Sequence, residues 1–526
     1  MSQALHIFKK DVRHLRFEIA IAISVVAAFT LIEVKHALWP VDAVYSNTAA
    51  SYLALLLLPV AWWMLIGRAI HDEALPGDRQ FWITRPYSWR GLLSAKMLFI
   101  LAFINLPMLI AQLVIVRAYG FSLGAELPGL LCSQILLTIV FVLPIFAMSA
   151  LTNGFVQLIA GILAPCVIAL VLAGLSFNFK PQFILMGVAS GFSPGHQWVR
   201  TCLIFLIITV AASAIVFWQY RRRGTTAARG FAATAWILVA MVFYFVSWPA
   251  SFRIDSALSR SQVDLSSTRL VSDLGAEAPT IAFRQGEGYV GVHIPLQIQG
   301  LPSGTSARIE NLFETFQAPD GTTWKSDGFA WQNPEGPDQQ FFVQTGFYGA
   351  SYLQRHDVPV NVHGSLYLTV FGNPRTTQLS FGERSVPVPQ VGLCSATESA
   401  IGQRYYVVCS SAFRSPAVLV SYRFVQSGGE TSKDRNPFLG GAQMSFSPFP
   451  ADLRISPVSQ VSTSSWVVVP WDHALLETLE PVGHIRLDFE ITGLRLGPRP
   501  KRSAALSLNP SREQTLSSLT LEPRRE

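Results

Sequence analysis

The stretch with the most chemically versatile side chains runs over residues 67–96, between two long apolar segments. It mixes acidic, basic and aromatic residues and contains two helix breaks, at Pro76-Gly77 and at Arg85-Pro86. Charged and aromatic side chains in a rigid element suit docking to a partner protein, because they offer ion pairs and buried anchors. A solvated loop in which Trp82 and Trp89 anchor at the membrane interface is the alternative.

No enzyme motif accompanies these side chains. The sequence has no H-E-x-x-H, no G-x-S-x-G, no paired-cysteine metal site and no G-x-x-x-x-G-K-[S/T] phosphate-binding loop. Asp, Glu, Lys and Arg are absent from 97–116, 127–179, 201–219 and 231–252, although coupled transporters and intramembrane proteases usually place ionisable groups at that depth. We therefore predict that the chain is not itself an enzyme and holds no cofactor or metal.

The elements that must position the loop are apolar helices long enough to cross a bilayer. Hydrophobic residues make up 50% of the chain and charged residues 14%, and the long apolar runs lie almost entirely before residue 250. A spanning helix needs about 20 mainly apolar residues. The pattern predicts an α-helical polytopic membrane domain over 17–250. Its expected spans lie near 17–34, 49–67, 92–116, 128–150, 155–176, 201–219 and 231–250.

Polar residues and prolines inside these spans are few. For the polar side chains we expect hydrogen bonds between helices, with substrate contact as the alternative. We expect the prolines to kink their spans. The polar residues are Asn105, Gln112, Ser133, Gln134 and Gln157, and the prolines expected to kink spans three, four and five are Pro107, Pro144 and Pro165.

The basic residues predict the topology. The formal net charge is +7, and Lys and Arg cluster before the first span, between the second and third, and between the sixth and seventh. The positive-inside rule makes these segments cytoplasmic, so the N-terminus lies inside and the chain after residue 250 outside. The positive charge then faces anionic lipid, and we expect no nucleic-acid partner.

Residues 1–16 have their own pattern. Leu5, Phe8, Val12 and Leu15 recur at spacings of three and four between basic residues, which predicts an amphipathic interfacial helix. The alternative is that these residues form the first turns of a long first span. We predict an uncleaved first helix, because the cleavage site of a signal peptide is missing before Glu33.

The loop after the second span resembles permease subunits of ATP-binding-cassette (ABC) exporters, in a bacterial group with a D-x-x-x-x-D-R-x-F-W-x-T-R-P pattern. The order of parts is also similar from Met1 to about Tyr220, with an interfacial helix, six spans and a second cytoplasmic turn at 149–154. Glu73 stands where an aspartate is commoner. The matching residues are Glu73, Gly77, Asp78, Arg79, Phe81, Trp82, Thr84, Arg85 and Pro86, followed by Leu93 and Ala95-Lys96.

The resemblance implies the transmembrane permease subunit of an ATP-driven exporter in the bacterial inner membrane. A separate cytoplasmic ABC ATPase would bind ATP, and a second permease copy or a paralogue would complete the transporter. The expected cargo is amphipathic, lipid-like or peptide. The implied ATPase-coupling residues are Asp72, Glu73, Asp78, Arg79, Phe81, Trp82, Thr84, Arg85 and Pro86. The alternative function is a membrane-anchored extracytoplasmic protein that binds or senses a ligand without transport.

The second half reads as a water-soluble, strand-rich region. Runs of β-branched and aromatic residues bounded by Gly, Pro, Ser and Asn predict an all-β extracytoplasmic domain of one or two β-sandwiches. We expect a linker at 251–279, β-domains at 280–390 and 391–498, and a flexible tail at 499–526. The predicted strands are 289–300, 365–372, 404–410, 417–425, 465–471 and 484–496.

The two cysteines of this half predict a disulfide. Cys394 and Cys409 flank a short connection between strand candidates, in a compartment that the topology makes oxidising. Cys132, Cys166 and Cys202 fall in predicted spans, where they serve as small apolar residues.

Overall fold

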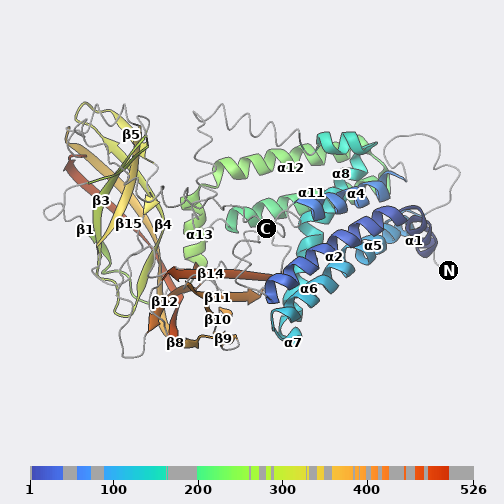
Figure 1. Cartoon of the computed structure of the whole chain (residues 1–526). Coiled ribbons are helices and arrows are strands. Elements are labelled where there is room, and N and C mark those ends of the chain that lie inside the picture. Colours follow the sequence, from blue (N-terminus) through green and yellow to red (C-terminus); the bar gives the residue numbers. More distant parts are fainter. Residues whose placement is uncertain are drawn as a thin grey trace, which may run out of the picture. The chain divides into compact units, whose positions relative to one another are not determined.

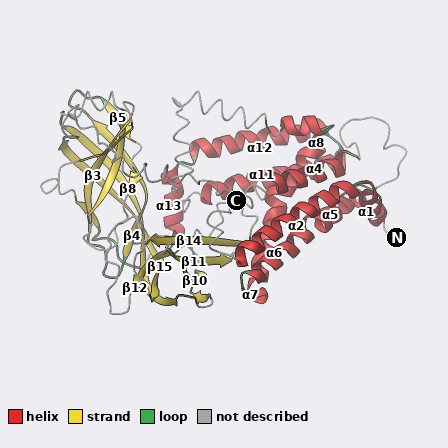
Figure 2. Cartoon of the chain, in the orientation of Figure 1, coloured by secondary structure: helices red, strands yellow, loops and turns green. Residues whose placement is uncertain are grey.

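A computed structural model gives the fold of the chain. The described part of the chain begins with helices and ends with antiparallel strands (Figure 2). The described residues are 3–38, 56–72, 88–161, 163, 198–259, 262–271, 280–285, 289–326, 329–330, 340–348, 358–382, 385–389, 391–398, 404–412, 418–425, 444–445, 457–466 and 472–496.

The helices occupy the first half of the chain (Figure 1). Two of them, η2 and η3, are single π-helical segments inside longer helices. In order they are α1 Gln3–His14, α2 Arg16–Leu38, α4 Leu58–His71, α5 Trp89–Ile100, η2 Leu101–Asn105, α6 Leu106–Ala118, α7 Leu123–Leu136, η3 Leu137–Val142, α8 Leu143–Leu151, α11 Trp198–Arg222, α12 Thr225–Phe245 and α13 Trp248–Leu258.

Within the described ranges, five helices are long and apolar enough to cross a membrane: Arg16–Ala37, Trp89–Ala118, Leu123–Leu151, Val199–Arg222 and Thr225–Val242. They correspond to the spans predicted at 17–34, 92–116, 128–150, 201–219 and 231–250. The protein is therefore a multi-pass membrane protein. Of the other two predicted spans, 49–67 is described only from residue 56 and enters α4, and most of 155–176 lies outside the described residues.

The helices pack around one apolar core and turn other apolar side chains outward. Trp62, Phe29 and Phe99 are fully buried, and α2 packs on α4 and α6, as α11 does on α8 and α12. Phe17 and Leu31 of α2, by contrast, are largely exposed. Such side chains fit a hydrocarbon solvent, because lipid tails are as apolar as they are.

The end of the last span differs from the prediction. The helix stops at Phe245, and a new helix, α13, begins at Trp248 with Pro249 in its first turn, where a missing N–H costs nothing. The segment expected to be a linker therefore contains most of α13. Phe252 of α13 packs edge-on against His484 at a centroid distance of 5.8 Å, and Asp255 lies 3.8 Å from the same imidazole.

The strands form three open antiparallel sheets within the described ranges. The sheet orders are β1-β3-β7-β6 with β2 added on β3, β14-β11-β10-β9, and β13-β12-β15-β8-β4-β5. The strands are β1 Arg269–Val271, β2 Thr280–Gln285, β3 Tyr289–Gln299, β4 Ser306–Gln317, β5 Thr323–Ser326, β6 Phe329–Ala330, β7 Gln340–Tyr348, β8 Val360–Ser380, β9 Val386–Val388, β10 Gly392–Glu398, β11 Arg404–Ala412, β12 Leu419–Val425, β13 Met444–Ser445, β14 Val458–Trp466 and β15 His473–Leu494.

The chain divides into two compact units, each of which combines two separate stretches of the sequence. The first unit joins residues 1–263 to 370–484, and the second joins 264–369 to 485–526. Within the first unit, the apolar core of the helices continues into its strands through Phe121, Ala412 and Val458. The boundaries of these units differ from those of the consecutive domains expected at 280–390 and 391–498. The sandwich architecture of those domains stays a prediction.

Two strands are much longer than the sequence indicates. β8 spans 21 residues and β15 spans 22, so each contributes to both units. The predicted strands 365–372 and 484–496 cover only parts of them. The turn-forming residues Gly372, Asn373 and Pro374 look like a strand end, yet β8 continues through them with Asn373 at a φ of 54°.

A disulfide joins Cys394 to Cys409, the pair predicted from the sequence. The two cysteines lie directly opposite each other on β10 and β11, with Cα atoms 4.1 Å apart. Both side chains are fully buried in an apolar cluster that includes Val407, Val420 and Leu476. The disulfide therefore joins two neighbouring strands of the β14-β11-β10-β9 sheet within a buried apolar cluster.

We predict that the double substitution Cys394→Ala, Cys409→Ala destabilises the protein by about 3 kcal/mol, because it removes a crosslink that restricts the unfolded chain. Thermal melting of the purified protein measures the loss. In denaturant without reductant, a thiol-reactive polyethylene glycol should modify only Cys132, Cys166 and Cys202 of the wild type. Modification of all five cysteines without reductant would contradict the pairing.

Candidate functional site at the loop end of the helices

The loop that carries the resemblance starts after α4 and ends before α5. Asp72, the residue that ends α4, is the one predicted coupling residue that the structure describes. The site is therefore defined here by the two ends of the loop and by the helices that hold them. The other predicted coupling residues lie outside the described ranges: Glu73, Asp78, Arg79, Phe81, Trp82, Thr84, Arg85 and Pro86.

Both loop ends contact the N-terminal helix α1. At the first end, Asp72 Oδ2 lies 3.2 Å from His14 Nε2, which forms an ion pair when the imidazole is protonated. At the second end, the Ser88 backbone N–H and hydroxyl donate to Gln3 Oε1 over 3.2 and 3.1 Å. Ser88 also caps α5 by accepting from the Gly91 N–H, as its position before the span predicts. Opposite ends of α1 thus hold the two ends of one loop.

A buried ion pair fixes α1 on the third predicted span. Lys96 Nζ of α5 lies 2.7 Å from Asp11 Oδ2 of α1, and the side chains are only 1% and 4% exposed. Lys96 lines a small apolar cavity together with Ile70, Phe99 and Phe146. In such surroundings each charge depends on the other, since an unpaired buried charge costs several kcal/mol. Figure 1 shows α1 alongside α5 near the N-terminus.

The buried row of α1 agrees only in part with the predicted one. Ile7 and Asp11 of α1, and Leu15 directly after it, are buried at spacings of four residues, while Phe8 and Val12 are partly buried beside them. Leu15 belongs to the predicted row, whereas the prediction passed over Ile7 and Asp11. The burial of Asp11 could have been predicted from its position four residues from both Ile7 and Leu15, because residues four apart share a helix face.

A second ion pair at this end is weaker. Arg68 Nε of α4 lies 3.5 Å from Glu18 Oε1 of α2, and the two side chains are 55% and 24% exposed. Solvated pairs of this kind contribute about 0–1 kcal/mol. The Lys96–Asp11 pair therefore dominates the electrostatics of the site.

The C-terminal end of α4 contacts the second predicted turn. His71, next to Asp72, lies with Nε2 3.1 Å from the hydroxyl of Thr152, which belongs to the predicted second turn at 149–154. The Thr152 hydroxyl itself donates to the Met148 carbonyl over 3.0 Å. In the same turn the Asn153 N–H donates to Gln157 Oε1 over 3.0 Å, so Gln157 caps the next helical stretch. Segments 81 residues apart thus share one polar contact.

Comparison with protein-family models and with curated proteins gives no match. The resemblance to exporter permeases therefore rests on the loop motif and on the order of parts.

We predict that Lys96→Met destabilises the protein by about 3–5 kcal/mol, because Asp11 stays buried without its cation. The double variant Asp11→Leu, Lys96→Met should recover most of this loss, since two apolar side chains need no partner. Thermal melting in detergent measures both, with Arg68→Gln as an exposed control that changes stability by about 1 kcal/mol or less. A double variant as unstable as Lys96→Met would contradict the account.

A separate polar network lies inside two neighbouring spans. Ser133 Oγ and Gln134 Nε2 both donate to Gln112 Oε1, over 3.0 and 2.8 Å. Asn105 Nδ2 donates to Thr138 Oγ1 over 2.8 Å and to Gln134 Oε1 over 3.3 Å. The network links η2 and α6 to α7 and η3, which is the helix-to-helix bonding expected of these residues.

Each of the same two spans contains a π-helical turn. Segment η2 ends directly before α6, whose first turn holds Pro107, and η3 ends directly before α8, whose first turn holds Pro144. A proline has no N–H and clashes with the carbonyl of the preceding turn, so a widened turn before it relieves the clash. Two of the three predicted kink sites, Pro107 and Pro144, thus follow a π-helical turn, whereas Pro165 lies outside the described residues.

We predict that Gln112→Leu destabilises the helical bundle by about 1 kcal/mol, because the Ser133 hydroxyl and the Gln134 amide lose their shared acceptor in a lipid-shielded position. Thermal melting in lipid nanodiscs tests this. Val114→Leu on the outward face of the same helix is the matched control and should leave stability unchanged. An equal effect of both substitutions would count against the network.

Proposed function

We propose that the chain is the permease subunit of an ATP-driven ABC exporter, which couples a separate cytoplasmic ATPase to the movement of an amphipathic, lipid-like or peptide substrate. The observation that carries the proposal is the anchoring of the motif loop. Its two ends are bound to α1 through Asp72 and Ser88, and its first end also reaches the second predicted turn through His71 and Thr152.

The anchoring provides a mechanical route from the loop to the membrane helices. A force on loop residues such as Asp78 and Arg79 would pass to α1 through the contacts of Asp72 and Ser88. It would pass from α1 to α5 through the buried pair of Asp11 and Lys96. The two spans with π-helical turns supply the points at which the bundle bends. ATP hydrolysis itself takes place in the partner subunit, since this chain has no phosphate-binding loop.

The proposed membrane topology of the protein rests on the basic segments and on the disulfide. The N-terminus and the motif loop face the cytoplasm of a bacterial cell, and the β-region lies outside the inner membrane. The Cys394–Cys409 disulfide is consistent with that compartment, because structural disulfides persist where the medium is oxidising. Two permease subunits, identical or paralogous, complete the transporter.

The test is the ATPase activity of the assembly purified from the native host through an affinity tag on this chain. Wild type should bring down a subunit that hydrolyses MgATP. The charge reversal Asp78→Arg, Arg79→Asp should reduce the activity recovered at least tenfold, because it inverts the charge pattern of the docking loop. Arg269→Asp, exposed on β1, is the matched control and should recover wild-type activity.

Recovery of the chain alone, with no ATPase activity above that of an untagged strain, would overturn the proposal. That outcome would favour the second candidate, a membrane-anchored protein that binds or senses an extracytoplasmic ligand. The observation that supports this candidate is a hollow on the sheet of the second unit, lined by charged and aromatic side chains.

A further inference from the structure

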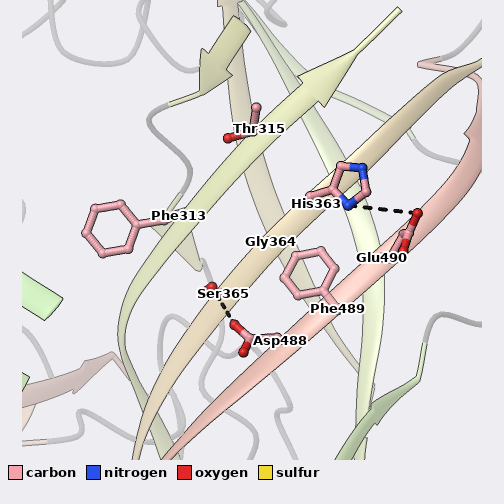
Figure 3. A pocket seen from close by; sticks show the side chains of 8 residues that line it. All are labelled: Phe313, Thr315, His363, Gly364, Ser365, Asp488, Phe489 and Glu490. Atoms are coloured by element: carbon pink, nitrogen blue, oxygen red, sulfur yellow. Dashed lines mark hydrogen bonds and ion pairs between the residues drawn. The ribbon is translucent and has the colours of Figure 1, made fainter. Parts of the chain in front are cut away.

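The second compact unit carries an open hollow of ≈ 570 Å³ on one of its sheets. Three strands that are neighbours in the sheet form it, in the order β15-β8-β4 (Figure 3). Side chains alternate between the two faces of a strand. Phe313 and Thr315, His363 and Ser365, and Asp488 and Glu490 are therefore pairs that share a face on their respective strands.

The hollow contains two carboxyl groups that remain accessible. Asp488 is 63% exposed and Glu490 57%. Burial alone would raise the pKa of Asp488, but hydrogen bonds from Ser365 and Arg486 and the charge of Arg486 outweigh it and lower that pKa. Asp488 is thus an anion at neutral pH. Two residues apart on one strand, the carboxylates lie roughly 7 Å from each other.

One oxygen of Asp488 is free for a ligand. Ser365 Oγ lies 2.6 Å from Oδ1, and Arg486 Nε and Nη2 lie 2.8 and 2.7 Å from the same oxygen. Among the described residues, these polar contacts of Asp488 all use Oδ1, which leaves Oδ2 available. Glu490 is held only loosely there, with Oε1 3.8 Å from His363 Nδ1.

The cation near the hollow is already engaged. The Arg486 guanidinium binds Asp488 and Ser365 and lies over the ring of Tyr367 at 5.7 Å. It is not one of the side chains that line the hollow. An anionic ligand would have to break these contacts, whereas a cationic ligand meets two carboxylates directly. Charge therefore favours a cation.

An exposed aromatic ring lines the hollow on the strand β4, across β8 from the carboxylates on β15 (Figure 3). Phe313 is 42% exposed, although its edge packs on Tyr367 at a centroid distance of 5.8 Å. An exposed ring fixed by a buried neighbour offers contact area at a small entropic cost. The hollow thus combines negative charge with an apolar surface.

We propose that this hollow binds a cationic amphipathic ligand, with an ammonium or guanidinium group between Asp488 and Glu490 and an apolar group on Phe313. A peptide segment with a lysine or arginine next to an aromatic or aliphatic residue has this chemistry. The binding does not depend on the proposed transport function, because it needs only the folded second unit.

The test uses the tripeptide acetyl-Lys-Phe-Lys-amide and the full-length protein in nanodiscs of zwitterionic lipid, so that the lipid itself does not attract the probe. Binding of the fluorescently labelled peptide should be saturable. The isosteric pair Asp488→Asn, Glu490→Gln should weaken it about tenfold, because two ion pairs are lost. Glu480→Gln, on the same strand but outside the hollow, is the control and should leave the affinity unchanged.

The variant Arg486→Gln distinguishes a cationic ligand from an anionic one. It should strengthen binding of the cationic peptide about threefold, because it removes a competing positive charge from Asp488. Weaker binding in this variant, undiminished binding in the double variant, or tighter binding of acetyl-Glu-Phe-Glu-amide would each overturn the proposal. So would binding of a trisaccharide, instead of the peptide, that is lost in the double variant.

Discussion

The buried ion pair between Lys96 and Asp11 is the interaction on which the arrangement of the helices around the motif loop depends. Separating these buried charges would cost several kcal/mol, which favours the position of α1 in which Asp11 meets Lys96. With α1 in that position, Gln3 and His14 at its two ends reach Ser88 and Asp72. A long-range contact thus supports the contacts at both ends of the loop.

Lipid as a solvent sets the remaining constraints on the helices. Apolar side chains such as Phe17 face outward at no cost, so helices cannot associate by burying hydrophobic surface alone. The hydrogen bonds among Asn105, Gln112 and Gln134 supply specific contacts between two spans. Each of those spans also contains a π-helical turn. The hydrogen-bonded contacts between the spans thus lie next to these irregular turns.

Much of the fold could be predicted because its signals are local. Apolar length marks the spans, Ser88 marks the start of α5, and the compartment and spacing of Cys394 and Cys409 indicate a disulfide. The missed features depend on distant partners. The burial of Asp11 is indicated by its place between Ile7 and Leu15, but its partner Lys96 lies 85 residues away and nothing local in α1 identifies it. The length of β8 was hidden because neighbouring strands extend Asn373 and Pro374, residues that alone favour a turn.

The interleaved order of the two units governs how the chain can be made. Residues 370–484 belong with the helices but leave the ribosome only after 264–369 have emerged. The helical segments thus enter the membrane long before the strands that complete their unit exist, and the disulfide forms later still. For the same reason neither unit can be cloned as one uninterrupted stretch: a cut after Val263 strips the first unit of its strands, and a fragment starting at Asp264 carries those strands without their helices.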